Sequence, residues 1–286
     1  MAASTAALRG ITKQYKDFTL GPVDMTVPAG SIVGLIGENG AGKTTLLKIL
    51  CGVNRADDGT VDLLGGSPAD AATRAKIGVV FEDVFFYGSF TAAQVARSLA
   101  GMYGARWNAD SFSAYLRRFG LDAGKKLKEY SRGMRLKLSL AAALAHDPEL
   151  LVLDEATAGL DPVVRGELLD LFLEFIQDER HSIVMSSHIT ADLEQIADSI
   201  AYLHNGQLLF QENKDDLLQE YGVLHCGEDV LTSLPAGLVV FTRRGAYGCE
   251  SLVRERRTVQ ELLPEAVCDA ARLDDIMRFY SGRDAQ

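Results

Sequence analysis

Several features that mark large classes of proteins are absent from this sequence. The four cysteines form no C-x-x-C pair and lack metal-ligand spacing, which favours reduced, partly buried thiols over a zinc site or a disulfide framework. No apolar run approaches the ~18 residues of a membrane-spanning helix. The N-terminal stretch has no long apolar core, so no signal peptide is predicted. If this chain works at a membrane, we expect another chain to hold it there.

Basic residues are also scarce relative to acidic ones. The chain has 29 lysines and arginines against 39 aspartates and glutamates, which gives a formal net charge of −10. This balance argues against a broad nucleic-acid-binding surface, so no nucleic-acid partner is expected. The rest of the composition, with 47% hydrophobic and 24% charged residues in 286, is that of a globular chain with a sizeable core and one large or two modest domains.

A glycine-rich turn at residues 37–45 reads GENGAGKTT, and it follows the apolar run 32–36 and precedes the apolar run 46–50. A strand, a turn and a helix with the spacing G-x-x-x-x-G-K-T predict a phosphate-binding P-loop. Glycines let the backbone N–H groups surround the phosphates, and the helix directs its positive end at them. Lys43 can reach the β- and γ-phosphates of ATP, and the Thr44 hydroxyl can coordinate Mg²⁺. The predicted nucleotide-binding residues of this loop are Gly37, Asn39, Gly40, Ala41, Gly42, Lys43, Thr44 and Thr45.

Two acids follow a second buried strand. The apolar run 150–153 leads directly into Asp154 and Glu155. In an open α/β sheet, ligands bind at the carboxyl end of the strands. Asp154 is therefore predicted to help hold Mg²⁺, and Glu155 to polarise the water that attacks the γ-phosphate. Together with the P-loop, these acids predict a triphosphate-hydrolysing site.

At this point the chain resembles the ATP-binding cassette (ABC) family, the nucleotide-binding subunits of ABC transporters. The segment 130–134, YSRGM, stands where the family has its Leu-Ser-Gly-Gly-Gln signature. The segment 158–161 is similar to the D-loop, and Ser187-His188 to the switch-histidine loop. Tyr15 is placed like the aromatic residue that stacks on adenine. The resemblance covers about residues 6–210.

The resemblance implies a shared, two-chain site. Two cassettes would pack head to tail, with ATP between the P-loop of one copy and the signature of the other. Ser131 and Gly133 would contact the γ-phosphate from across the interface, Asp161 would link the two sites, and His188 would orient the attacking water. The implied catalytic residues are Glu155, His188 and Asp161.

Two residues depart from the family pattern. Glu82 stands where the family usually has Gln; its carboxylate could also reach Mg²⁺ and bind it more strongly, so altered Mg²⁺ dependence is expected. Arg132 replaces a glycine of the signature, and two interpretations stay open: it adds charge to the phosphate contact across the dimer, or it projects into solvent. Similar Tyr-Ser-x-Gly-Met signatures occur in a branch of ABC exporters whose ATPase and permease are separate chains, including multidrug and antimicrobial-peptide exporters. The segment 217–222, LLQEYG, is similar to tails in that branch.

The pattern of runs predicts an α/β fold with a mostly parallel sheet. We expect a P-loop NTPase (RecA-like) core with a β-rich N-terminal subdomain and an inserted helical subdomain at about residues 84–146. Residues 1–210 would form the ABC nucleotide-binding domain, and residues 211–286 a small α+β C-terminal accessory domain. The aromatic cluster Phe85-Phe86-Tyr87 would belong to the core or to a groove that receives the permease.

The expected function is that of an ATP-hydrolysing subunit with ATP and Mg²⁺ as cofactors. It would dimerise on ATP and drive integral membrane permease subunits, for export, at the cytoplasmic face of the cell membrane. One alternative is a soluble ABC-type ATPase acting on ribosomes or nucleic acid, although those normally carry two cassettes or a coiled-coil insertion. Another is a regulatory ATP-binding module with weak hydrolysis.

Overall fold

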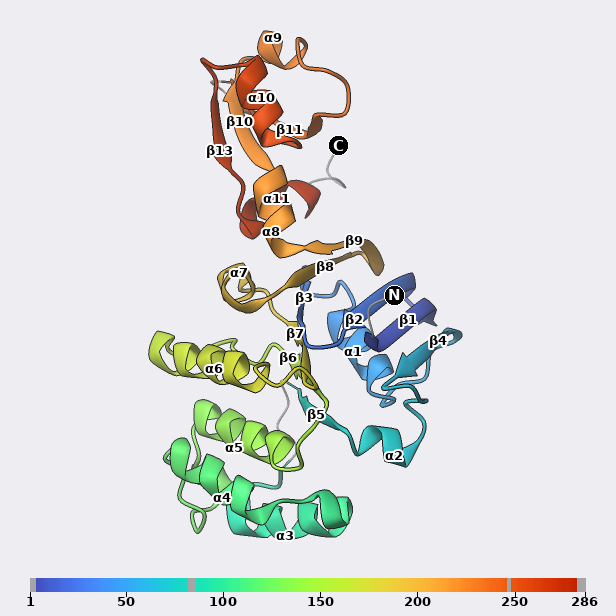
Figure 1. Cartoon of the computed structure of the whole chain (residues 1–286), viewed down its shortest axis with the longest axis vertical. Coiled ribbons are helices and arrows are strands. Elements are labelled where there is room, and N and C mark those ends of the chain that lie inside the picture. The colour runs from blue at the N-terminus through green and yellow to red at the C-terminus, as the bar shows by residue number, and fades with distance from the viewer. Residues whose placement is uncertain (1–3, 82–85, 246–247, 282–286) are drawn as a thin grey trace.

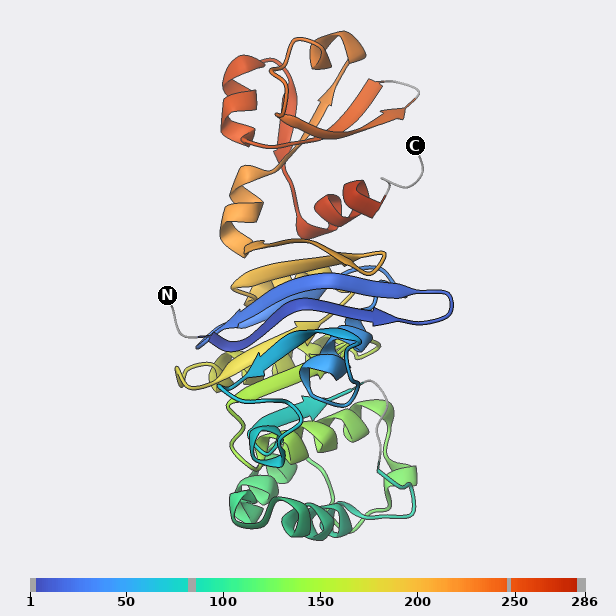
Figure 2. The same cartoon turned by 90° about the vertical axis from the view of Figure 1, so that its right-hand side faces the viewer.

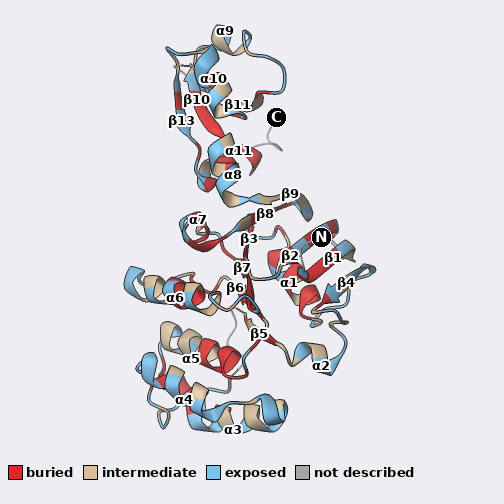
Figure 3. Cartoon of the chain, viewed as in Figure 1, coloured by how far each residue is buried: buried red, intermediate tan, exposed pale blue. Residues whose placement is uncertain are grey.

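A six-stranded, mostly parallel sheet forms the centre of the computed structural model, which describes residues 4–81, 86–245 and 248–281. The strand order is β5-β6-β7-β3-β8-β9; only β9 is antiparallel to its neighbour. Both faces of the inner strands are buried, as expected where helices cover a parallel sheet (Figure 3). The strands are β3 (Ile32–Ile36), β5 (Ile77–Val80), β6 (Leu150–Asp154), β7 (Ser182–Ser186), β8 (Ser199–His204) and β9 (Gln207–Asn213).

Alternate residues of these strands enter two different hydrophobic cores. On one face Val33 and Leu35 pack with helix α1 (Lys43–Leu50) and with the N-terminal strands. On the other face Ile32 and Ile36 share a core with α5 (Arg132–Leu144), α6 (Pro162–Phe175) and α7 (Thr190–Ile196). Figure 1 shows these helices on opposite sides of the sheet. The expected RecA-like α/β core is therefore present.

The N-terminal subdomain is an antiparallel sheet of order β2-β1-β4. Its strands are β1 (Ser4–Gln14), β2 (Thr19–Pro28) and β4 (Asp58–Leu63), and the short helix α2 (Ala71–Arg74) follows. Pairing with β1 extends β2 and β4 beyond their apolar residues.

The helical block between β5 and β6 has a hydrophobic cluster of its own, around Phe112, Leu116 and Leu138. Side chains cap the N-termini of its helices. Thr91 forms a capping box with Gln94, and the Ser131 hydroxyl accepts from the N–H of Met134. The expected start at residue 84 lies outside the described residues. The block comprises α3 (Ala92–Tyr103), η1 (Gly104–Arg106), α4 (Ala109–Arg118), η2 (Leu127–Glu129) and α5.

The tail forms an antiparallel sheet of order β11-β12-β10-β13 with helices beside it, above the cassette in Figure 2. The strands β10 and β13 were not expected from the sequence. Buried residues of α11 share one continuous core with β8 and α7, so the tail packs directly on the cassette. The elements are α8 (Lys214–Glu220), β10 (Gly222–Cys226), α9 (Glu228–Leu231), β11 (Val239–Gly245), β12 (Gly248–Val253), α10 (Arg256–Leu262), β13 (Val267–Ala270) and α11 (Leu273–Ser281).

Within the described ranges, none of the helices combines the length and the apolar character needed to cross a membrane.

Candidate active site

The P-loop joins β3 to α1 and passes very close to the β8–β9 hairpin. A Cβ atom added at Gly37 would lie 2.2 Å from the carbonyl oxygen of Leu203, so only glycine fits there. Gly42, the N-cap of α1, has φ 106°, in the left-handed region. The N–H of Gly206 in the hairpin donates to the oxygen of Ala41 over 3.1 Å. The hairpin therefore holds the loop where its N–H groups and the start of α1 can face an anion.

Lys43 is the most buried charged residue of the loop, with 6% of its surface exposed. Its Nζ donates to the carbonyl oxygens of Gly37 over 2.7 Å and Glu38 over 3.2 Å. It also lies 3.4 Å from Oε1 of Glu155. The cation is thus held beside both the loop and the catalytic acid predicted from the sequence. Thr44, at the start of α1, is exposed.

The two acids at the carboxyl end of β6 are held by one serine on the neighbouring strand. Ser186 ends β7 directly opposite Asp154, and its hydroxyl donates to Oδ1 of Asp154 over 2.6 Å. The same hydroxyl accepts from the N–H of Glu155 over 3.0 Å, and Glu155 has φ 52°. Asp154 is only 2% exposed, so this hydrogen bond supports a buried carboxylate. Ser186 was not among the predicted site residues, because its contact with Asp154 depends on the pairing of β6 with β7.

His188 contacts the second oxygen of the Glu155 carboxylate. Its Nδ1 lies 2.6 Å from Oε2 of Glu155, and its backbone N–H donates to the same oxygen over 3.3 Å. Glu155 therefore lies between Lys43 on one oxygen and His188 on the other. A carboxylate held in this way, next to a phosphate-binding loop, can accept a proton from a water molecule and be oriented by the histidine. The structure thus brings together Lys43, the adjacent acids Asp154 and Glu155, and His188, which come from three separate segments of the sequence.

Cys51 is the C-cap residue of α1, and its thiol is buried. Burial, with a smaller contribution from the nearby Asp154 carboxylate, raises the pKa of Cys51 to about 12. It is a neutral thiol at physiological pH, and all four cysteines of the chain are free. A buried, protonated thiol of this kind belongs to the hydrophobic core and supplies no nucleophile to the site.

The signature and D-loop segments lie against each other within the chain. Ser131 is the exposed N-cap of α5, and a Cβ added at Gly133 would lie 3.6 Å from Leu160. Arg132 places its Nη1 3.0 Å from the Cβ position of Gly159, which has φ 69°. Its guanidinium therefore lies over the D-loop of its own chain, a position that neither of the two interpretations of Arg132 described.

Asp161 and Tyr15 have local contacts of their own. Asp161 is the N-cap of α6, where its Oδ1 accepts from the N–H of Val164 over 3.0 Å. Tyr15 is 42% exposed in the β1–β2 turn, with its ring 6.4 Å from that of Phe18. A Cβ at Gly42 would lie 2.9 Å from Phe18, so the turn is next to the P-loop. The predicted metal ligand Glu82 and the aromatic Phe85 lie outside the described residues.

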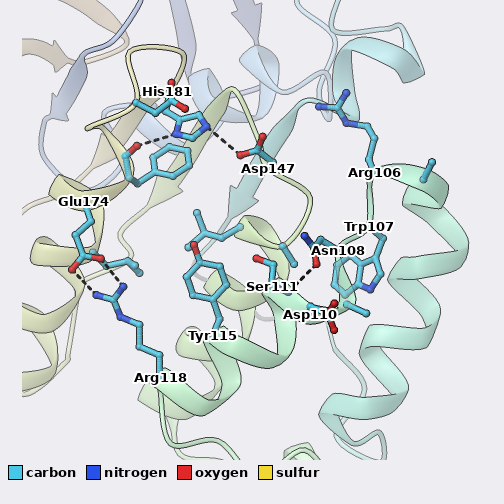
Figure 4. A pocket seen from close by; sticks show the side chains of 17 residues that line it. Arg106, Trp107, Asn108, Asp110, Ser111, Tyr115, Arg118, Asp147, Glu174 and His181 are labelled. Carbon is cyan, nitrogen blue, oxygen red and sulfur yellow. Dashed lines mark hydrogen bonds and ion pairs between the residues drawn. The ribbon is translucent and has the colours of Figure 1, made fainter.

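A cavity of about 820 Å³ lies elsewhere, between the helical block and the core (Figure 4). It is bordered by the paired ion contact of Arg118 with Glu174, at 2.6 and 2.8 Å. On its other side His181 stacks on Phe175 and lies 3.3 Å from Asp147. Among the described residues, none of the predicted site residues lines this cavity, so it is not part of the candidate active site.

Comparison with known proteins decides between the possible classes of P-loop protein. Residues 20–158 match the family model described as ABC transporter. The chain is 38% identical over 206 residues to an uncharacterized ABC transporter ATP-binding protein of Synechocystis sp., covering 70% of this chain and 58% of that protein. It is 36% identical over 212 residues to the bacitracin transport ATP-binding protein BcrA of Enterococcus faecalis, covering 72% and 68%. The chain belongs to the ABC transporter family.

Two further ABC proteins agree with this membership. The lantibiotic transport ATP-binding protein SrtF of Streptococcus pyogenes is 32% identical over 211 residues, covering 73% of this chain and 90% of that protein. A solved ATP-binding subunit of an ABC transporter has a TM-score of 0.68 at 28% identity, over 75% of this chain and 92% of that one. Membership places the chain among the ATP-binding, ATP-hydrolysing cassettes. It favours a transporter subunit over an ATPase acting on ribosomes or nucleic acid.

Proposed function

We propose that this chain hydrolyses ATP as one of two cassettes that drive a separate membrane permease, for export, at the cytoplasmic face of the cell membrane. The observation that carries the proposal is the position of Glu155. Its two carboxylate oxygens lie 3.4 Å from Lys43 and 2.6 Å from His188, at the end of the strand beside the P-loop. This arrangement suits water activation next to a bound γ-phosphate.

The residues around Glu155 also suit ATP with Mg²⁺. Lys43 would exchange the carbonyls of Gly37 and Glu38 for the β- and γ-phosphates. The Thr44 hydroxyl and the Asp154 carboxylate are hard oxygen ligands of the kind Mg²⁺ prefers, and Ser186 fixes Asp154 from behind. Held there, Mg²⁺ would neutralise negative charge on the phosphates. Glu155 then takes the proton of the attacking water while His188 holds Glu155 in place.

Dimerisation would complete the site from the other side. Ser131 caps an exposed helix N-terminus, and Gly133 beside it leaves the backbone open to close approach. These are the features that would bind the γ-phosphate of a second copy. Asp161, at the start of α6, would lie at the same interface, and Tyr15 would stack on the adenine.

An apolar cavity of about 680 Å³ is our candidate for the permease contact. It lies between the core and the helical block and is lined by Val79, Phe81, Phe86, Leu99 and Tyr103, among others. Tyr87, 74% exposed, follows Phe86 in the chain. We propose a short amphipathic helix of the permease as the occupant, because such a helix would cover this apolar lining. Loss of copurification with the permease in a Phe86→Ala variant that retains ATPase activity would support the assignment.

The cargo class is proposed from relatives. Two of them are named for bacitracin transport and lantibiotic transport. We propose that the permease partner exports peptide antimicrobials, and that its own residues recognise them. Identification of the membrane protein that copurifies with this chain tests this point, and a permease of an import system would contradict it.

The catalytic assignment is tested by Glu155→Gln. We expect ATP turnover to fall by about 10²-fold or more while ATP still binds, so that an ATP-bound dimer accumulates in size-exclusion chromatography. Glu149→Gln is the matched control, because Glu149 precedes the opposite end of the same strand and its carboxylate lies 3.4 Å from Lys76, away from the P-loop. Equal turnover in both variants would refute the role of Glu155, and very low ATP turnover in the wild-type chain would favour a regulatory ATP-binding module.

A further inference from the structure

The C-terminal domain contacts the segment that carries His188. Helix α7 begins at Thr190, and its next turns pack against α11 of the C-terminal domain. Leu193 and Ile196 on α7 are buried in the same hydrophobic core as Leu273 and Ile276 on α11. The switch-histidine segment is therefore next to the domain to which no chemistry is assigned.

One side chain on α7 makes the polar connection. Oε1 of Glu194 accepts from the N–H of Leu273, the first residue of α11, over 2.7 Å. A carboxylate at the N-terminus of a helix satisfies a free N–H group and interacts favourably with the helix dipole. The backbone oxygen of the same Glu194 accepts from Nζ of Lys214, the first residue of α8, over 3.0 Å. The first residues of α8 and α11 in the C-terminal domain therefore both hydrogen-bond to Glu194 of α7.

The other end of α7 is tied to the active site by short contacts. Only Ile189 separates His188 from Thr190, and its N–H donates to the hydroxyl of Ser187 over 2.9 Å. Asp192, 3% exposed, lies 3.4 Å from Arg165 near the start of α6. Because a single residue separates α7 from His188, we expect a shift of this short helix to reach His188.

We infer that Glu194 is a positioning residue for ATP hydrolysis. Through its bond to the N-terminus of α11, the C-terminal domain holds α7, and thereby His188, where His188 can orient Glu155. A ligand, partner or modification that displaces α11 then lowers the hydrolysis rate without touching the nucleotide. The inference rests on the role of His188 stated in the proposed function.

The experiment uses the full chain and compares Glu194→Ala with Glu194→Gln. The alanine variant loses the acceptor of the Leu273 N–H, and we expect its kcat for ATP to fall about three- to tenfold with little change in KM, the range expected for residues that couple two sites. The amide oxygen of glutamine still accepts this N–H, so Glu194→Gln is expected to keep most of the wild-type kcat.

Arg254→Ala provides the matched control. Nε of Arg254 donates to the Tyr221 hydroxyl over 2.8 Å and its Nη2 lies 4.0 Å from Glu212, so it anchors the same domain without a described contact to α7. We expect both alanine variants to lower the thermal midpoint, and only Glu194→Ala to lower kcat. Equal kcat values in the two variants would show that Glu194 is only a structural anchor.

A double variant separates this inference from the function it rests on. If Glu194 acts through His188, Glu194→Ala causes no further loss of kcat in a His188→Ala background. Additive losses would overturn the inference and leave the role of His188 standing. Wild-type turnover in His188→Ala alone would instead remove the proposed role of His188, and the inference with it.

Discussion

At the scale of single residues, two glycines of the P-loop have different surroundings. A Cβ at Gly37 would lie 2.2 Å from the backbone oxygen of Leu203, whereas a Cβ at Gly40 meets no atom within 4 Å. We expect Gly37→Ala to destabilise the protein by about 3 kcal/mol, because a backbone atom has to move. Gly40→Ala should cost about 1–2 kcal/mol, the strain of a left-handed alanine at φ 85°. Urea unfolding midpoints measure both, and equal losses would contradict the contact.

The residues of the site were predictable to different degrees. Lys43, Asp154 and Glu155 follow from local spacing, because a phosphate loop and a strand end each have a short sequence signature. Ser186 does not, since its contacts depend on the register that places it opposite Asp154. The place of Arg132 over Gly159 depends on how α5 meets the D-loop, which a single sequence does not specify.

At the scale of elements, strands β6 and β7 share one hydroxyl between two acids. Ser186→Ala removes the donor to Asp154 and the acceptor of the Glu155 N–H together. We expect a loss of about 1–3 kcal/mol in unfolding free energy, because a buried carboxylate loses its hydrogen bond. Lower Mg²⁺ affinity in an ATPase titration should accompany it.

A control distinguishes this effect from a general loss of stability. Ser199, at the start of β8, has a buried hydroxyl without a hydrogen-bond partner among the described residues. Ser199→Ala should therefore leave both stability and Mg²⁺ dependence close to wild type. If Ser186→Ala behaves in the same way, the serine does not support the metal site.

Elements were predictable where burial gives a sequence pattern. The fully buried strands β3, β6 and β7 each contain a run of three or more apolar or glycine residues. Strand β13 has only Cys268 buried among four residues, so no alternation marks it. Strand β10 lies between β12 and β13, and its five residues become a strand through this pairing.

At the scale of the whole molecule, one hydrophobic core crosses from the cassette into the C-terminal domain. The ring of Tyr280 lies 5.7 Å from that of Tyr202, 5.5 Å from Phe210 and 4.9 Å from Phe241. Tyr202 and Phe210 belong to the cassette, and Phe241 and Tyr280 to the C-terminal domain. We therefore expect the cassette and the C-terminal domain to unfold together.

Tyr280→Ala tests this coupling. We expect a loss of about 3–5 kcal/mol, as for other large aromatic truncations. The single tryptophan, Trp107, lies in the helical subdomain, so its fluorescence reports on the cassette. The urea midpoints from fluorescence and from circular dichroism should fall together. Val267→Ala, at a 58% exposed position of the C-terminal domain, should move neither. An unchanged fluorescence midpoint in Tyr280→Ala would mean that the C-terminal domain unfolds on its own.

The contact between Lys43 and Glu155 has a consequence for nucleotide affinity. The carboxylate proposed to activate water is also an internal anion that occupies the lysine. The phosphates of ATP must displace this carboxylate from Lys43 before hydrolysis. The contact therefore lowers the affinity of the site for ATP. Removing the charge of Glu155 therefore does two things: it stops turnover, and it frees Lys43. Part of the ATP retention in Glu155→Gln should then be tighter binding, measurable at equilibrium with a non-hydrolysable analogue.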